Sequence, residues 1–136
     1  MSDAKRPLIL VVADDLGKLT YLDSLLGRKG NLITTCSTRA DAEKAVAGHK
    51  LDLVIVGRMG EEGDENALIW KVKNLSPGTK LIQLVDNPDW AASIAPLNAG
   101  ADELLSAPYS EEELLKSIKR LLSHDFPPPR PGGTVS

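Results

Sequence analysis

The sequence predicts an α/β domain in which five parallel strands, in the order 2-1-3-4-5, carry helices on both faces. Five short apolar runs alternate along the chain with segments of helical periodicity, and repeated βα units form parallel sheets that are covered on both sides. Right-handed crossovers then restrict the possible strand orders. The apolar runs at 8–13, 51–56 and 80–85 are the most uniform, so these strands should lie in the middle of the sheet.

The strands are predicted where branched apolar residues gather between turns. The first run, LILVVA, is continuous, which is typical of a strand buried on both faces. The second, NLITTC, carries threonines on one side and suits an edge of the sheet. The predicted strands are residues 8–13, 31–36, 51–56, 80–85 and 102–107.

The helices are predicted from apolar spacing and from capping residues. Ser110 and Glu113 have the spacing of a capping box, which opens the last helix. A fourth helix over 89–99 contains Pro96, which removes a backbone donor, so we expect this helix to be short, kinked or remodelled. The other predicted helices cover residues 19–26, 37–48 with Ser37 or Thr38 as the cap, and 66–75.

Length and composition limit the domain organisation. At 136 residues the chain suits one domain, which we place at residues 7–123. Residues 1–6 are expected to form an N-terminal arm, and the Pro/Gly-rich residues 124–136 a disordered tail. No further domain pattern follows, so we expect any output to pass through partner proteins or self-association.

Charge and cysteine content argue against several classes of protein. A net charge of −3 does not suit a nucleic-acid-binding surface, which needs a basic stripe. No apolar run approaches the roughly 20 residues of a membrane helix. The single cysteine, Cys36, cannot form a disulfide within the chain and fits a reducing cytosol. We therefore expect a cytoplasmic protein that contacts neither membranes nor nucleic acid directly.

A candidate site is predicted where the strand order reverses, between the first and third strands. A crevice opens at the carboxyl ends of such strands. Asp14 and Asp15 follow the first strand, and Gly57 follows the third. Two adjacent carboxylates can hold Mg²⁺. They can equally cap the first helix, whose amino end favours negative charge.

Four motifs resemble the receiver domain of bacterial two-component response regulators: LILVVADD, LDLVIVG, KLIQLV and NAGADELLSAPY. The resemblance covers about residues 7–123 and implies a flavodoxin-like (βα)5 doubly wound sandwich. In that family an acidic pair and an aspartate ending the third strand bind Mg²⁺. This aspartate accepts a phosphoryl group from a histidine kinase. A Ser or Thr, a Lys and a switch aromatic complete the family's site.

The resemblance places different residues at most of these positions. The acidic pair is present, as Asp14 and Asp15. The phosphoacceptor position holds Gly57, the Ser/Thr position Val85, the Lys position Ala107 and the switch position Leu104. None of these four can do the family's chemistry, because a covalent phosphoryl acceptor needs a nucleophile. We therefore expect a degenerate receiver that is no enzyme, has no cofactor and binds Mg²⁺ weakly at best.

Neighbouring charges leave two questions open. A carboxylate among Glu61, Glu62 and Asp64, or one of the acidic pair, could accept a phosphoryl group instead. Arg58 could fold over the crevice and pair with the acidic residues, in place of both metal and lysine, or it could remain solvated.

Three functions are consistent with these features. The first is a phosphorylation-independent receiver that binds a protein partner or a second copy through its fourth helix, fifth strand and fifth helix. Trp90, Leu105 and Tyr109 are the candidate contact residues of that face. The second is a receiver phosphorylated at a non-standard carboxylate in an Mg²⁺-dependent way. The third is a flavodoxin-like module that binds a small ligand in the crevice.

Overall fold

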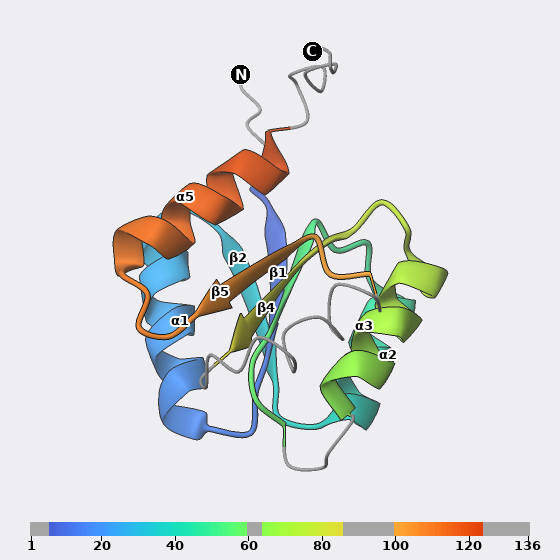
Figure 1. Ribbon diagram of the computed structural model, residues 1–136. Coiled ribbons are helices and arrows are strands. Elements are labelled where there is room, and N and C mark those ends of the chain that lie inside the picture. Colours follow the sequence, from blue (N-terminus) through green and yellow to red (C-terminus); the bar gives the residue numbers. More distant parts are fainter. Residues whose placement is uncertain (1–5, 60–63, 86–99, 124–136) are drawn as a thin grey trace.

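The strands form one parallel sheet in the order β2-β1-β3-β4-β5, as the sequence predicts (Figure 1). The structure is a computed structural model that describes residues 6–59, 64–85 and 100–123. The predicted helix at 89–99, residues 1–5 of the arm and the tail 124–136 lie outside the described residues. The strands are β1 (Leu8–Val12), β2 (Leu32–Cys36), β3 (Leu53–Val56), β4 (Lys80–Val85) and β5 (Glu103–Ser106).

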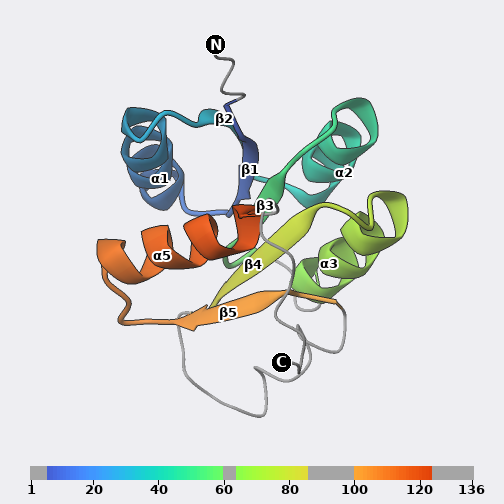
Figure 2. The same ribbon diagram turned by 90° about the horizontal axis from the view of Figure 1, so that it is seen from above.

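Helices cover both faces of this sheet. Figure 2 shows α1 and α5 packed on one face and α2 and α3 on the other. Among the described residues, no helix combines the length and the apolar character that a membrane crossing requires. The described helices are α1 (Leu16–Arg28), α2 (Arg39–Gly48), α3 (Asp64–Leu75) and α5 (Glu111–Leu122).

The sheet separates two hydrophobic cores, one on each of its faces. Every residue of β3, and four of the five in β1, is buried. Because successive side chains of a strand point to opposite faces, Ile9 and Val11 belong to the core under α1 and α5. Leu10 and Val12 belong to the core under α2 and α3. Each fully buried side chain of this size contributes about 1.5–3 kcal/mol, which holds the central strands in place.

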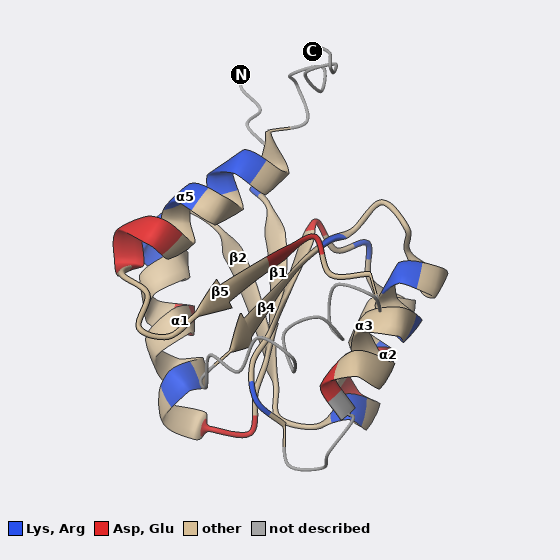
Figure 3. Cartoon of the chain, in the orientation of Figure 1, with Lys and Arg blue, Asp and Glu red and all other residues tan. Residues whose placement is uncertain are grey.

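The ends of α2 and α5 match the sequence prediction. Thr38 caps α2 by accepting a hydrogen bond from the Asp41 N–H at 3.1 Å. Ser110 and Glu113 form the predicted capping box, in which each side chain accepts from the other residue's backbone N–H. Figure 3 shows acidic residues in the first turn of α5 and basic residues in its last turns. This charge order stabilises a helix through its dipole.

The third strand begins two residues later than the sequence predicts, at Leu53 instead of Leu51. Asp52 is the reason. Its Oδ2 accepts a hydrogen bond from the Leu8 N–H at 2.8 Å, and its own N–H donates to the Leu8 carbonyl at 2.9 Å. The side chain is therefore committed to the start of β1.

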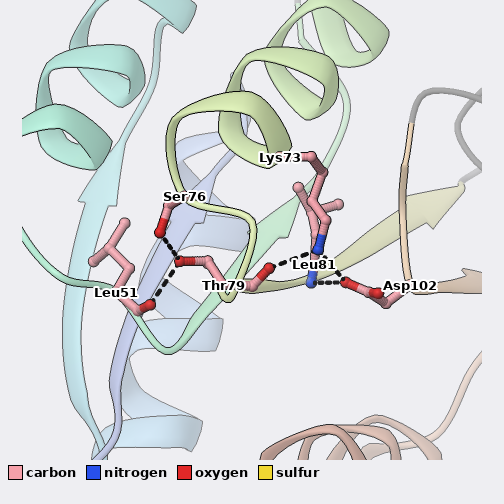
Figure 4. Close-up of polar contacts among 6 residues, drawn as sticks. All are labelled: Leu51, Lys73, Ser76, Thr79, Leu81 and Asp102. Carbon is pink, nitrogen blue, oxygen red and sulfur yellow. Dashed lines mark hydrogen bonds and ion pairs between the residues drawn. The ribbon is translucent and has the colours of Figure 1, made fainter.

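A polar network closes the amino-terminal edge of the sheet (Figure 4). The Thr79 hydroxyl donates to the Leu51 carbonyl at 2.8 Å and lies 2.7 Å from the Ser76 hydroxyl. Thr79 is almost fully buried, and a buried hydroxyl needs such partners. The network thereby joins the end of α3 to the chain entering β3 and β4.

Candidate functional site

The loops that follow β1 and β3 lie against each other at the carboxyl edge of the sheet, as predicted. The Asp14 N–H donates to the Arg58 carbonyl at 2.9 Å, and the Gly57 N–H donates to the Val12 carbonyl at 2.7 Å. The acidic pair and Gly57 therefore lie side by side at the point where the strand order reverses, which is where α/β sheets open a crevice.

The two residues of the acidic pair have different structural roles. Asp15 is the N-cap of α1, and its Oδ1 accepts from the Gly17 N–H at 2.9 Å and the Lys18 N–H at 3.2 Å. The interpretation of this residue as a helix cap is thereby confirmed. Asp14 precedes the cap, and both residues are exposed.

A cavity of about 190 Å³ lies beside the acidic pair and is lined by Ala13, Asp14, Asp15, Lys18 and Arg58. Arg58 contributes its carbonyl to the hydrogen bond described above, and its side chain is exposed. Within the described part of the chain, no ion pair of 4.0 Å or less joins its guanidinium to either carboxylate. The cavity therefore brings two acidic and two basic side chains together without a direct Arg58 pair.

Gly57 is buried, and it lies beneath the side chain of Lys18, a residue that no sequence motif marks as part of the site. A Cβ added at Gly57 would lie 3.1 Å from Ala13 Cβ and 3.7 Å from Lys18 Cδ. The stem of Lys18 thus covers the end of β3. The available sequence signal was weak: Lys18 stands in the first turn of a helix, where the helix dipole disfavours a cation.

The described residues at the crevice offer fewer oxygen ligands for Mg²⁺ than the receiver resemblance implies. One oxygen of Asp15 already accepts two backbone N–H groups. Gly57 offers no side-chain oxygen, and the described residues contain no group of three potential metal ligands. The aliphatic stem of Lys18 also lies close to position 57, with its Cδ 3.7 Å from the place of a Cβ there. Mg²⁺ binds through one or two carboxylates together with waters and other oxygen ligands, so Asp14 and the remaining oxygen of Asp15 form a weaker donor set than the three carboxylates that the resemblance implies.

Val85 and Ala107 meet at the same edge of the sheet. The Ala107 N–H donates to the Val85 carbonyl at 2.7 Å. A second cavity, of about 500 Å³, lies beside this contact and is lined by Asp15, Gly17, Lys18, Tyr21, Ala107, Pro108 and Tyr109. Ala107 lines this cavity without an ammonium, and Val85, its hydrogen-bond partner, carries no hydroxyl.

The predicted switch and contact residues divide between the faces of β5. Leu104 pairs with Gln83 and is half-buried. Leu105 pairs with Leu84 and packs, with Tyr109, against the core under α1 and α5. Both are half-buried, and Trp90 lies outside the described residues.

The acidic loop after β3 is only partly described, because Glu61 and Glu62 lie outside the described residues. Asp64 begins α3. Glu65 Oε2 accepts a hydrogen bond from the Met59 N–H at 2.8 Å. This carboxylate is therefore committed to fixing the chain after Gly57 and Arg58.

Two titratable side chains near the sheet edge have altered acidity. Burial and a 3.1 Å hydrogen bond to Glu111 raise the pKa of the Tyr21 hydroxyl above its ordinary value. Burial, followed by the charge of Asp41, raises the pKa of the Cys36 thiol. A thiol with a raised pKa is a poor nucleophile at neutral pH.

Comparison with known proteins shows what this architecture resembles. No protein-family model matches the chain. It is 30% identical to Protein PetR of Rhodobacter capsulatus over 124 residues, which are 90% of this chain and 51% of PetR. It is 31% identical to the transcriptional regulatory protein GltR of Pseudomonas aeruginosa, covering 84% of this chain and 48% of GltR. The chain spans about half the length of these curated relatives.

Solved structures match over nearly their whole length. The signal receiver domain of an HD domain-containing protein from Pseudomonas fluorescens is 26% identical, with a TM-score of 0.83 and coverage of 91% of this chain and 92% of that one. A CheY-like response regulator receiver domain protein from Methanospirillum hungatei is 25% identical, with a TM-score of 0.81 and coverage of 87% and 94%. With the strand order and the acidic pair, these likenesses identify the chain as a response regulator receiver (CheY-like) domain.

Proposed function

We propose that this receiver domain signals without phosphorylation, by binding a protein partner or a second copy of itself. One observation carries the proposal: the carboxyl end of β3 presents Gly57, which has no nucleophile. Its N–H is bonded to the Val12 carbonyl, so the position is fixed in the sheet beside the acidic pair. Covalent capture of a phosphoryl group at this point is chemically impossible.

Two further positions support the proposal. Phosphoryl transfer depends on donors and cations that stabilise the charge of the transferring group. Val85 and Ala107 stand next to each other at the ends of β4 and β5, and neither side chain can donate a hydrogen bond or carry a charge. The differences from the family's pattern therefore occur at the ends of three strands, β3, β4 and β5, while the acidic pair after β1 is kept.

The proposed contact face comprises β5, α5 and the fourth helix of the sequence analysis. Leu105 and Tyr109 are half-buried, so they would support this face and contribute only their outer edges. The role of Trp90 as a contact residue stays a prediction, because it lies outside the described residues. We place the interaction in the cytoplasm, with a protein partner and no direct contact to nucleic acid.

The first test is phosphorylation by a small donor. The protein is incubated with acetyl phosphate and Mg²⁺, and its intact mass is measured beside that of an active receiver domain. We expect no phosphoryl adduct on this chain. An Mg²⁺-dependent adduct that maps to Asp14, Asp15 or the 61–65 loop would overturn the proposal and favour phosphorylation at a non-standard carboxylate.

The second test addresses the contact face. Self-association is measured by light scattering, and binding of a co-purified partner by pull-down, for the protein and for a charge-reversal variant, Glu112→Arg with Lys116→Glu. Both residues are exposed on α5. We expect this variant to lose the interaction, whereas Lys44→Glu on the exposed side of α2 keeps it. Equal loss in both variants contradicts the proposed face.

A further inference from the structure

Lys18 occupies an unusual position in the candidate site. It lies in the first turn of α1, and no acidic residue stands in that turn. A positive charge here faces the positive end of the helix dipole, which is unfavourable unless negative groups nearby compensate for it. Asp14 and Asp15 line the same cavity as Lys18, so negative groups of the required kind are present there.

The stem of Lys18 also fills the space at the end of β3. Its Cδ lies 3.7 Å from the point where a Cβ at position 57 would be. The side chain is half-buried, as expected when an aliphatic stem packs on the protein and its charged end reaches water. The absence of a side chain at Gly57 is thus matched by the presence of Lys18 above it.

Lys18 connects the two cavities of the site. With Asp15, it lines both the cavity beside Arg58 and the cavity beside Ala107. Lys18 therefore shares one cavity with both acidic residues and a second cavity with the uncharged Ala107. The receiver resemblance implies a lysine at the position of Ala107, and in this chain the lysine of the same cavity is Lys18 of α1.

We propose that Lys18 is a built-in cation of the crevice, which balances the charge of Asp14 and Asp15 in place of a bound metal ion. This inference deepens the proposed function, because it names what keeps the acidic pair stable in a receiver that is not phosphorylated. It predicts that the crevice needs no divalent cation and that the charge of Lys18 excludes one.

The test is a metal titration of a variant that keeps the stem and removes the charge. Mn²⁺ binding is measured by calorimetry, and by electron paramagnetic resonance of the free ion, for the protein and for Lys18→Met. Removing a unit charge close to two carboxylates should tighten Mn²⁺ binding by about tenfold. Lys18→Arg, which keeps the charge, should bind Mn²⁺ as weakly as the unaltered protein.

Two controls make the result specific. Lys44→Met removes an exposed lysine of α2 and should leave Mn²⁺ binding unchanged. Adding Asp14→Asn to Lys18→Met should abolish the gain. The proposal is wrong if Lys18→Met binds Mn²⁺ no more tightly than the unaltered protein, or if Lys44→Met gives the same gain. Neither result bears on the acetyl phosphate experiment, so failure of this inference and failure of the proposed function are distinguishable.

Discussion

The ammonium of Lys73 lies 3.0 Å from Oδ2 of Asp102, and this oxygen also accepts a hydrogen bond from the Leu81 N–H at 2.8 Å (Figure 4). The Lys73 ammonium donates in addition to the Thr79 carbonyl at 2.8 Å. One carboxylate thus joins α3, β4 and the start of β5. The side chains of Lys73 and Asp102 are 20% and 27% exposed, so the pair is shielded from solvent more than a surface ion pair.

Removing this carboxylate should destabilise the domain. Asp102→Ala leaves the Leu81 N–H and the Lys73 ammonium without their shared acceptor, and we expect a loss of about 1–3 kcal/mol in the free energy of unfolding. Urea denaturation followed by circular dichroism measures it. Asp23→Ala, at an exposed position of α1, should change stability by less than about 0.5 kcal/mol. Equal effects of the two substitutions would contradict the role of the network.

Two glycines should respond in opposite directions to alanine. Gly100 has a φ of +119°, and an added Cβ would lie 2.8 Å from Lys73 Cγ, so Gly100→Ala should cost more than about 1 kcal/mol. Gly27 lies within α1 with no atom near its Cβ position, so Gly27→Ala should stabilise the domain by up to about 1 kcal/mol. Thermal denaturation compares the stabilities of the two variants. A stabilising Gly100→Ala would be inconsistent with the positive φ of Gly100.

The capping box of α5 gives a third prediction. Ser110→Ala removes the acceptor of the Glu113 N–H, a 3.0 Å hydrogen bond, and should lower the free energy of unfolding by about 1 kcal/mol. Ser110→Asp retains a cap acceptor and should keep most of the stability. If alanine and aspartate at this position are equivalent in urea denaturation, the cap does not stabilise the helix.

Tyr21 should make stability depend on pH in the alkaline range. Its pKa is raised above the ordinary value of 10.0, first by burial and then by the hydrogen bond and charge of Glu111. The folded state therefore holds the proton more tightly than the unfolded state. The resulting stabilisation is complete below pH 10 and is lost as pH rises through the raised pKa.

Absorbance titration of tyrosinate measures the pKa of Tyr21 directly. Of the two tyrosines in the chain, Tyr21 should ionise above pH 10, and Tyr21→Phe should remove that transition. Glu111→Gln takes away the negative charge and should lower the Tyr21 pKa. A Tyr21 that ionises below its ordinary value would show that the contact with Glu111 does not form.

The fold was predictable because the sequence patterns that indicate it each lie within a short stretch of the chain. The uninterrupted apolar runs marked β1, β3 and β4 as central, and their alternation with helices implied parallel pairing. The boundary at Leu53 was missed because Asp52 bonds to Leu8, 44 positions away, and no local pattern reports such a contact.

The candidate site was predictable only in part, for the same reason. Strand ends indicated that Asp14, Asp15 and Gly57 would meet. In the sequence, Lys18 has the pattern of an ordinary residue of an amphipathic helix. Its position above Gly57 depends on the orientation of α1 relative to β1, which no local pattern indicates. The sequence left both an ion-paired and a solvated Arg58 open. In the described residues its backbone carbonyl contacts the Asp14 N–H, while its guanidinium pairs with neither carboxylate.

The bonds at the strand ends depend on the main chain and not on the side chains at these positions. Gly57 is anchored through its N–H to Val12, and Val85 is anchored through its carbonyl to Ala107. Main-chain atoms make these attachments, and every residue type except proline at a donating position can supply them. The carboxyl edge of the sheet can therefore keep its alignment when the side chains displayed along it differ.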